Sequence, residues 1–161
     1  MAHQEHLDSA LKVRTALLNL QKELLNHLKT TFEKENARVV PPMEWLQVIM
    51  VAQRFSWLRE LTSLVADIDL LTELQEISQE RASLARTEVE RLFFEDSASE
   101  FSKHYMQLMK AGAPFMVTHG QLKESTNLLP QSQKTWTADE ALAERKKWHE
   151  EHHLQSRKRR S

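Results

Sequence analysis

Only two glycines and four prolines interrupt this chain of 161 residues. Hairpins, and the sheets built from them, need more turn residues than this, so their scarcity favours an all-α fold. The length is sufficient for one domain with a substantial hydrophobic core. We therefore expect an antiparallel helical bundle of four to six helices over residues 6–122, with a helical C-terminal tail.

The apolar sequence is densest in residues 41–74. In residues 57–71 the apolar side chains recur at steps of three and four, which is the period of a helix with one covered face. Residues 45–52 are apolar nearly all round, as in a helix covered on several sides. One unbroken helix here would be about 50 Å long. That is long for a domain of this size, so we expect a kink or break near residues 53–56.

Helices are also predicted on both sides of this stretch. Two parallel apolar stripes give residues 6–36 a wide apolar face. This helix should end near Asn36, because two valines and two prolines follow. Ser97 and Glu100 have capping-box spacing and predict another helix start. Gly112 lies where that helix would end.

A short helix is predicted from Pro114 to about Leu122. We expect its apolar side chains to be buried, namely Phe115, Met116, Val117 and Leu122. Earlier in the chain, Trp57 begins the one-sided apolar face, so it should be buried as well. Glu60 and Asp67 fall on the opposite, polar side of the same helix.

The composition changes at Lys123. Residues 123–136 are polar and contain a proline, which is typical of a linker. Thr137 and Glu140 have capping-box spacing, with Trp136 placed for a hydrophobic staple, so residues 137–161 are predicted to form a tail helix with a basic terminus. The apolar content of this helix is thin. We therefore expect the chain beyond Lys123 to be dispensable for folding.

Charge and composition exclude several classes of function. Residues 1–122 carry 13 Lys and Arg against 17 Asp and Glu, a charge of −4, whereas residues 123–161 carry 9 against 6, a charge of +3. No aromatic platform accompanies the basic residues, so specific nucleic-acid binding is not expected. Charges interrupt the apolar runs well short of a membrane span, so no membrane insertion is expected. The absence of cysteine and of a signal peptide favours a cytoplasmic protein.

The histidines are the residues most suggestive of chemistry. His149 and His153 are four apart on the tail helix, so both could face one metal ion. Nothing else in the sequence completes such a site, and a solvated helix face is the simpler interpretation. His27 lies on the apolar face of the first helix, where a core-edge histidine bonded to a neighbour is expected. No cofactor is predicted.

Four further residues could line a ligand pocket: Trp45, Trp57, Tyr105 and His119. A lone histidine and a lone tyrosine do not make an active site, because no nucleophile or substrate group is identified within reach. An enzyme is therefore the less favoured class. The alternative hypothesis is a helical bundle that binds a small ligand or metal in a pocket near Tyr105 and His119.

The leading hypothesis is a non-enzymatic helical module that acts through protein–protein contact or self-association, for instance as a homodimer. The predicted helices carry more apolar surface than the core of one small bundle requires. Trp136 and Trp148 in the tail are candidate interface residues, because exposed aromatic side chains often anchor interfaces.

Parts of the chain resemble a family of small uncharacterised bacterial proteins. The resemblance rests on Pro42 followed by Trp45-Leu46, and on the segments 55–59, 64–69 and 101–119. It covers residues 10–122 and leaves the C-terminal third without a counterpart. An Asp-Pro pair often precedes the aromatic cluster in that family, whereas Gln53-Arg54 is found here. The resemblance implies a cytoplasmic helical bundle and supplies no activity, cofactor or catalytic residue.

Overall fold

The computed structural model describes residues 2–95 and 97–160, and the regular structure in these residues is entirely helical. The elements are α1 (Ala2–Asn36), α2 (Pro42–Val51), the 3-10 segment η1 (Gln53–Leu58), α3 (Arg59–Leu71), α4 (Gln79–Phe93), α5 (Glu100–Lys110), α6 (Met116–Thr126) and α7 (Ala138–Arg160). The prediction of an all-α fold is confirmed. No helix in the described ranges has the length and apolarity that a membrane crossing requires.

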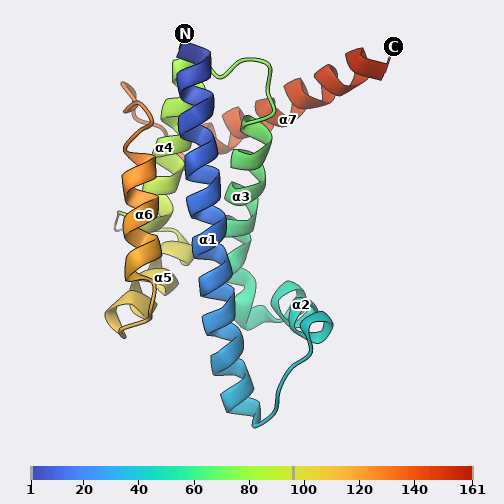
Figure 1. The fold of residues 1–161 in the computed structure, drawn as a ribbon, viewed down its shortest axis with the longest axis vertical. Helices are drawn as coiled ribbons and strands as arrows, with labels where there is room; N and C mark the ends of the chain where they lie inside the picture. The colour runs from blue at the N-terminus through green and yellow to red at the C-terminus, as the bar shows by residue number, and fades with distance from the viewer. Residues whose placement is uncertain (1, 96, 161) are drawn as a thin grey trace.

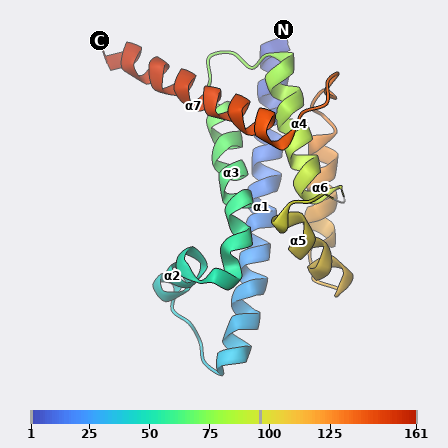
Figure 2. The same cartoon turned by 180° about the vertical axis from the view of Figure 1, so that it is seen from behind.

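Helix α1 is the axis of the molecule (Figure 1). Helices α3, α4 and α6 run beside it, and α2 projects to one side near the C-terminal end of α1. Helix α7 crosses α3 and α4 on the side that faces the viewer in Figure 2, and its C-terminal half projects away from the bundle. Of the two stripes predicted on α1, one forms the core and comprises Ala10, Val13, Leu17, Leu20 and Leu24. Leu18, from the other stripe, is 42% exposed.

The predicted break after α2 is confirmed. Ala52 has an extended backbone, with φ −67° and ψ 129°, and the chain then forms η1 before α3 begins. This reorientation turns Phe55, Trp57 and Leu58 inward, where all three are buried. Trp57 is therefore in the core, as the periodicity predicted.

Helix α1 ends at Asn36, as predicted. Ala37 follows with a positive φ of 53°, which stops the helix and turns the chain. The return to α2 is held by Glu33, whose Oε2 accepts a hydrogen bond from the Val40 amide at 2.7 Å. Pro42 then occupies the first turn of α2, where a missing N–H costs no hydrogen bond.

The capping residue of α5 differs from the prediction. Ser99, not Ser97, is the N-cap, and its hydroxyl accepts from the Ser102 amide at 3.2 Å. The Ser97 hydroxyl instead donates to the carbonyl of Arg91 at 2.9 Å and so fixes the end of α4. Both serines precede the helix closely enough to cap it, and tertiary contacts select the second. The helix ends before Gly112, at φ 84°, as predicted.

Helix α6 is longer than predicted and is oriented differently. It continues to Thr126, into the segment expected to be a linker. Phe115 and Leu122 are buried as predicted, but Met116 and Val117 are 70% and 73% exposed, so the prediction is wrong for these two. The covered side of α6 instead carries Thr118, whose hydroxyl donates to Glu23 of α1 at 2.8 Å.

Candidate functional site

Helix α2 is apolar on two opposite faces, of which the chain covers one. The inner face carries Trp45, which is 7% exposed. Its ring centroid lies 5.7 Å from that of Phe32 and 5.5 Å from that of Phe55. Trp45 was predicted to line a ligand pocket, and it instead anchors α2 to α1 and η1.

The outer face of α2 is uncovered. Met43, Leu46 and Met50 follow one another at i, i+3 and i+7, and they are 72%, 47% and 68% exposed. Val39 and Val51, at 83% and 80% exposed, extend this surface at its two ends. These five residues are called the outer stripe below. The prediction that residues 45–52 are covered on several sides is therefore wrong for a single copy of the chain.

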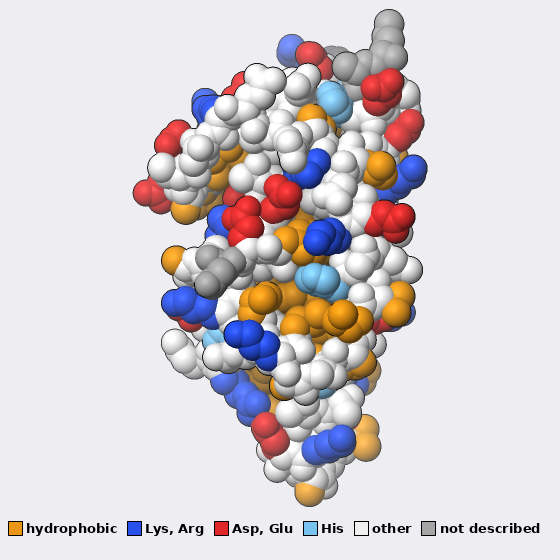
Figure 3. All heavy atoms as spheres, turned by 90° about the vertical axis from the view of Figure 1, so that its left-hand side faces the viewer, with side chains coloured by type: hydrophobic (Ala, Val, Ile, Leu, Met, Phe, Trp, Pro, Cys, Tyr) orange, Lys and Arg blue, Asp and Glu red, His pale blue; other side chains and the backbone are white. Residues whose placement is uncertain are grey.

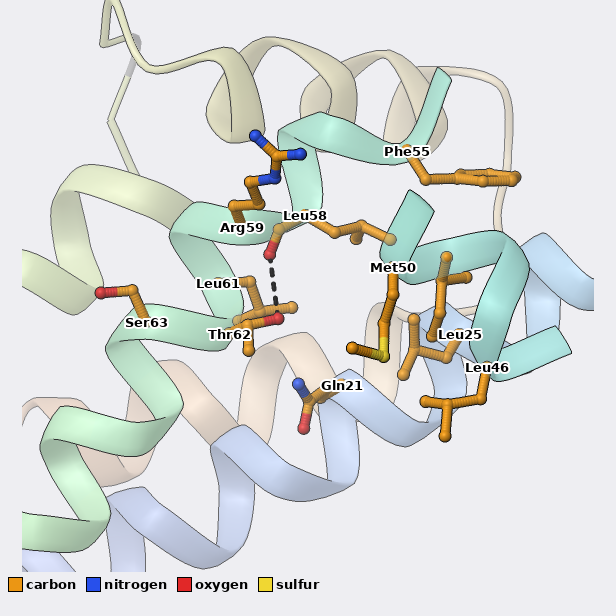
Figure 4. A pocket seen from close by; sticks show the side chains of 11 residues that line it. Gln21, Leu25, Leu46, Met50, Phe55, Leu58, Arg59, Leu61, Thr62 and Ser63 are labelled. Carbon is orange, nitrogen blue, oxygen red and sulfur yellow. Dashed lines mark hydrogen bonds between the residues drawn. The ribbon is translucent and has the colours of Figure 1, made fainter. Parts of the chain in front are cut away.

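A cavity of about 640 Å³ lies between α1, α2, η1 and α3. Two residues of the outer stripe, Leu46 and Met50, form part of its apolar wall (Figure 4). The rest of that wall comprises Leu25, Ile49, Phe55, Leu58 and Leu61. The polar side chains that line it are Gln21, Arg59, Thr62 and Ser63. The Thr62 hydroxyl donates to the carbonyl of Leu58 at 3.2 Å and keeps its lone pairs available. None of the four predicted pocket residues lines this cavity.

Trp57 lies away from Trp45, in another group of aromatic rings. Its indole stacks on the imidazole of His104, with centroids 4.7 Å apart and planes 10° apart. Its centroid is also 5.6 Å from that of Phe101. This arrangement attaches η1 to α5.

Tyr105 and His119 are brought together as predicted, and they bind each other. The phenol oxygen lies 2.7 Å from Nδ1 of His119. Burial raises the pKa of Tyr105, helped by the negative charge of Glu23. Burial also lowers the pKa of His119, helped by Lys123, so the neutral imidazole is favoured. A protonated phenol beside a neutral ring forms a satisfied hydrogen bond at the edge of the core.

The histidines of the tail bind carboxylates of the bundle. His149 Nε2 lies 2.6 Å from Oδ1 of Asp67, and His152 Nε2 lies 2.8 Å from Oε2 of Glu73. His153, the other predicted metal ligand, is exposed. Among the residues that the structure describes, no group of three or more His, Cys, Asp or Glu side chains could hold a metal ion.

The two tryptophans of the tail have different surroundings. Trp136 is half-buried, donates from Nε1 to the Ser132 hydroxyl at 3.2 Å, and has the Lys134 ammonium 3.8 Å from its ring centroid. The Thr137 hydroxyl caps α7 as predicted, accepting from the Glu140 amide at 3.1 Å. Trp148 is fully buried inside the chain itself. Its burial argues against a tail that is dispensable for folding.

A buried ionic network, which the sequence analysis missed, joins α7 to the bundle. Arg145 is 4% exposed, and its guanidinium donates to Asp67 at 2.6 Å and to Glu88 at 2.8 Å. It also donates to the Ser63 hydroxyl at 3.1 Å. Glu88 accepts a further bond from Arg91 at 2.9 Å, and Arg91 also binds Glu60 at 3.4 Å, so the network extends from α7 across α4 to the start of α3.

A signal for this packing exists in the sequence. Along one face of α7, residues that contact the bundle are spaced by four, three, four and three, namely Ala141, Arg145, Trp148, His152 and Gln155. This is a helical face, but three of its five members are polar. The apolar residues of α7 alone therefore do not mark this face.

A second exposed apolar patch lies on the side of α5 and α6. Met116 and Val117 are its most exposed members, and Met106 is 36% exposed. Figure 3 shows hydrophobic side chains gathered beside a histidine on this side, bordered by Lys and Arg. Unlike the outer stripe of α2, this patch follows no single helix face.

The fold and its surfaces define a small all-α protein with one uncovered apolar helix face and an adjoining cavity. No known protein family, curated protein or solved structure shows significant similarity to the chain.

Proposed function

We propose that this chain is a non-enzymatic interaction module that self-associates through the outer stripe of α2. The observation that carries the proposal is the exposure of Met43, Met50 and Val51, which are 72%, 68% and 80% exposed on a helix whose other face is already packed. Apolar side chains at i, i+3 and i+7 are the anchors of helix-to-helix recognition. Methionine adds a flexible, polarizable contact surface.

A second copy of the chain is the partner that the charges favour. The ionic groups at the two ends of α2 are paired, Arg38 with Glu44 and Arg54 with Glu35. The ends of the stripe are therefore close to neutral. In a twofold dimer each surface meets itself, so a neutral border avoids repulsion between like charges.

The length of α2 determines how strongly two copies are expected to bind each other. Its 10 residues span only about 15 Å, so the contact lies at the small end of specific interfaces. We therefore expect a dimer that dissociates on dilution.

The test is sedimentation velocity over a wide range of protein concentration. The mass of the wild-type protein should rise toward that of a dimer, and a Met43→Glu, Val51→Glu double variant should remain monomeric with unchanged helical content. Met116→Glu on α6 is the matched control, because Met116 is equally exposed. A wild type that is monomeric throughout, or a dimer that only Met116→Glu disrupts, would overturn the proposal.

A further inference from the structure

The cavity between α1, α2, η1 and α3 opens beside the outer stripe and shares two of its residues. Leu46 and Met50 belong to the stripe and also line the cavity, and they are 47% and 68% exposed. Thr62 and Ser63 of α3, which line it as well, are also exposed. A partner that packs on Leu46 and Met50 therefore also lies over the mouth of the cavity.

The lining of the cavity selects an apolar occupant. Leucine, isoleucine, methionine and phenylalanine side chains form most of its wall. Arg59 is the one charged side chain among the described residues that line it, and its guanidinium points away from the cavity (Figure 4). The Thr62 hydroxyl already donates to the Leu58 carbonyl. An aliphatic side chain can therefore enter without burying a charge or breaking a hydrogen bond.

The area that a dimer needs gives this cavity a role. Specific interfaces bury about 1,200 Å² or more in total. Helix α2 has 10 residues and spans only about 15 Å, so two outer stripes alone supply only part of this area. An apolar cavity left empty under the interface would also forfeit contacts on its walls. Partner side chains that enter the cavity, of about 640 Å³, reduce both deficits.

The position of the cavity at one end of the stripe favours one orientation of the two helices. Met50 lines the cavity, whereas Met43, seven residues earlier, does not. In a twofold dimer with parallel α2 helices, equivalent residues face each other, so the two cavities lie together and Met43 reaches neither. With antiparallel helices, Met43 of each copy lies opposite Met50 of the other and over its cavity. Each positive helix end then also lies near a negative one.

We propose that the two α2 helices pair antiparallel and that Met43 of each copy fills the cavity of the other, with Val39 beside it at the mouth. The pairing rests on the proposed self-association through the outer stripe. Within one chain Met43 and Val39 are uncovered, at 72% and 83% exposed. Methionine suits this position, because its unbranched, flexible side chain adapts to an irregular cavity.

Cross-linking between single-cysteine variants tests the orientation. The chain has no cysteine, so each introduced thiol is unique. Met43→Cys and Thr62→Cys proteins are mixed at a concentration where the wild type is dimeric, treated with a short bismaleimide and analysed by intact mass. We expect mainly the mixed dimer, and little product from Met43→Cys alone. Met116→Cys is the control partner, because Met116 is about as exposed as Met43, and it should give no product with Met43→Cys.

Exchanging volume between the two sites tests the insertion itself. Thr62→Trp fills the cavity from within the chain and should raise the dimer dissociation constant about tenfold or more, because Met43 of the partner is displaced. Adding Met43→Ala should recover part of this loss, whereas Met43→Ala alone should weaken the dimer. Thr30→Trp is the matched control, since Thr30 is also exposed and its hydroxyl also donates to the carbonyl four residues earlier, outside the cavity. Circular dichroism checks that each variant keeps its helical content.

The outcomes separate the insertion of Met43 from self-association as such. A dimer in which Met43→Cys cross-links to itself and not to Thr62→Cys would refute the antiparallel insertion and leave self-association through the outer stripe intact. The same holds if Thr62→Trp and Thr30→Trp dimerise equally well. A wild type that stays monomeric at every concentration would overturn both.

Discussion

Arg145 and Asp67 are 78 residues apart in the chain, and their side chains meet at 2.6 Å with both almost fully removed from water. Glu88 is buried beside them and binds the same guanidinium. Burying charges is costly unless each is paired and hydrogen-bonded, and here each has a partner. The contact therefore places α7 in one position on the bundle.

Replacing Arg145 by methionine should destabilise the protein strongly. The change leaves Asp67 and Glu88 buried without their shared cation, and breaking such a buried pair typically costs about 3–5 kcal/mol. The free energy of unfolding from urea titration measures the loss. Arg14→Met is the control, because the Arg14–Asp69 pair is 36% and 54% exposed and should contribute about 1 kcal/mol or less. Similar losses in the two variants would contradict a buried network.

Trp148→Ala should also destabilise the fold, by about 3–5 kcal/mol, because a fully buried aromatic side chain is removed. Leu154→Ala, six residues further along α7, is the comparison, since Leu154 is 55% exposed. A chain ending at Ser125 should lose cooperative melting. This outcome is the reverse of the sequence-based expectation of a dispensable tail, and a truncated chain with an unchanged melt would restore that expectation.

Glu60→Ala should weaken the start of α5. The Glu60 carboxylate accepts from the Ser99 hydroxyl at 2.9 Å and from the Phe101 amide at 3.2 Å, at the positive end of the helix dipole. Losing these bonds should cost about 1–3 kcal/mol, measured by thermal unfolding. Glu100→Ala removes an exposed acid from the same helix turn and should cost less than about 1 kcal/mol. A larger effect at Glu100 would show that charge alone, and not the hydrogen bonds, supports this helix start.

His119 should make the fold sensitive to mild acid. Burial lowers its pKa in the folded protein, whereas the unfolded chain takes up a proton near pH 6.5. The unfolded state therefore binds more protons below about pH 6.5, and stability is lost as the pH falls from there through the folded pKa. His119→Gln should flatten this part of the pH profile of unfolding free energy. His153→Gln, at an exposed position, should leave the profile unchanged.

The regular parts of this fold could be predicted from local pattern. The period of three and four places Leu61, Leu64 and Ile68 in the core, and the change from an all-round to a one-sided apolar pattern locates the break before α3. Each of these features depends on residues close together in the chain.

The features missed depend on pairs of distant elements. Glu60 falls on a polar helix face by pattern, and its hydrogen bonds to α5 and its ion pair with Arg91 of α4 arise only when these helices pack against it. Arg145 faces the core, although a charged residue is expected on a helix surface. Its burial depends on Asp67 of α3 and Glu88 of α4, which lie far from it in the chain. The cavity is space left between three helices, so no single segment encodes it.

The bond between Glu23 and Thr118 joins residues 95 positions apart, across the contact of α1 with α6. At a synthesis rate of about 5–20 residues per second, α1 leaves the ribosome roughly 5–20 s before α6 is complete. During that interval α3 and α4 are made and can cover part of α1, but the side of α1 that α6 covers has no intramolecular partner. Helix α1 is thus fully enclosed only after most of the helices that follow it have been synthesised.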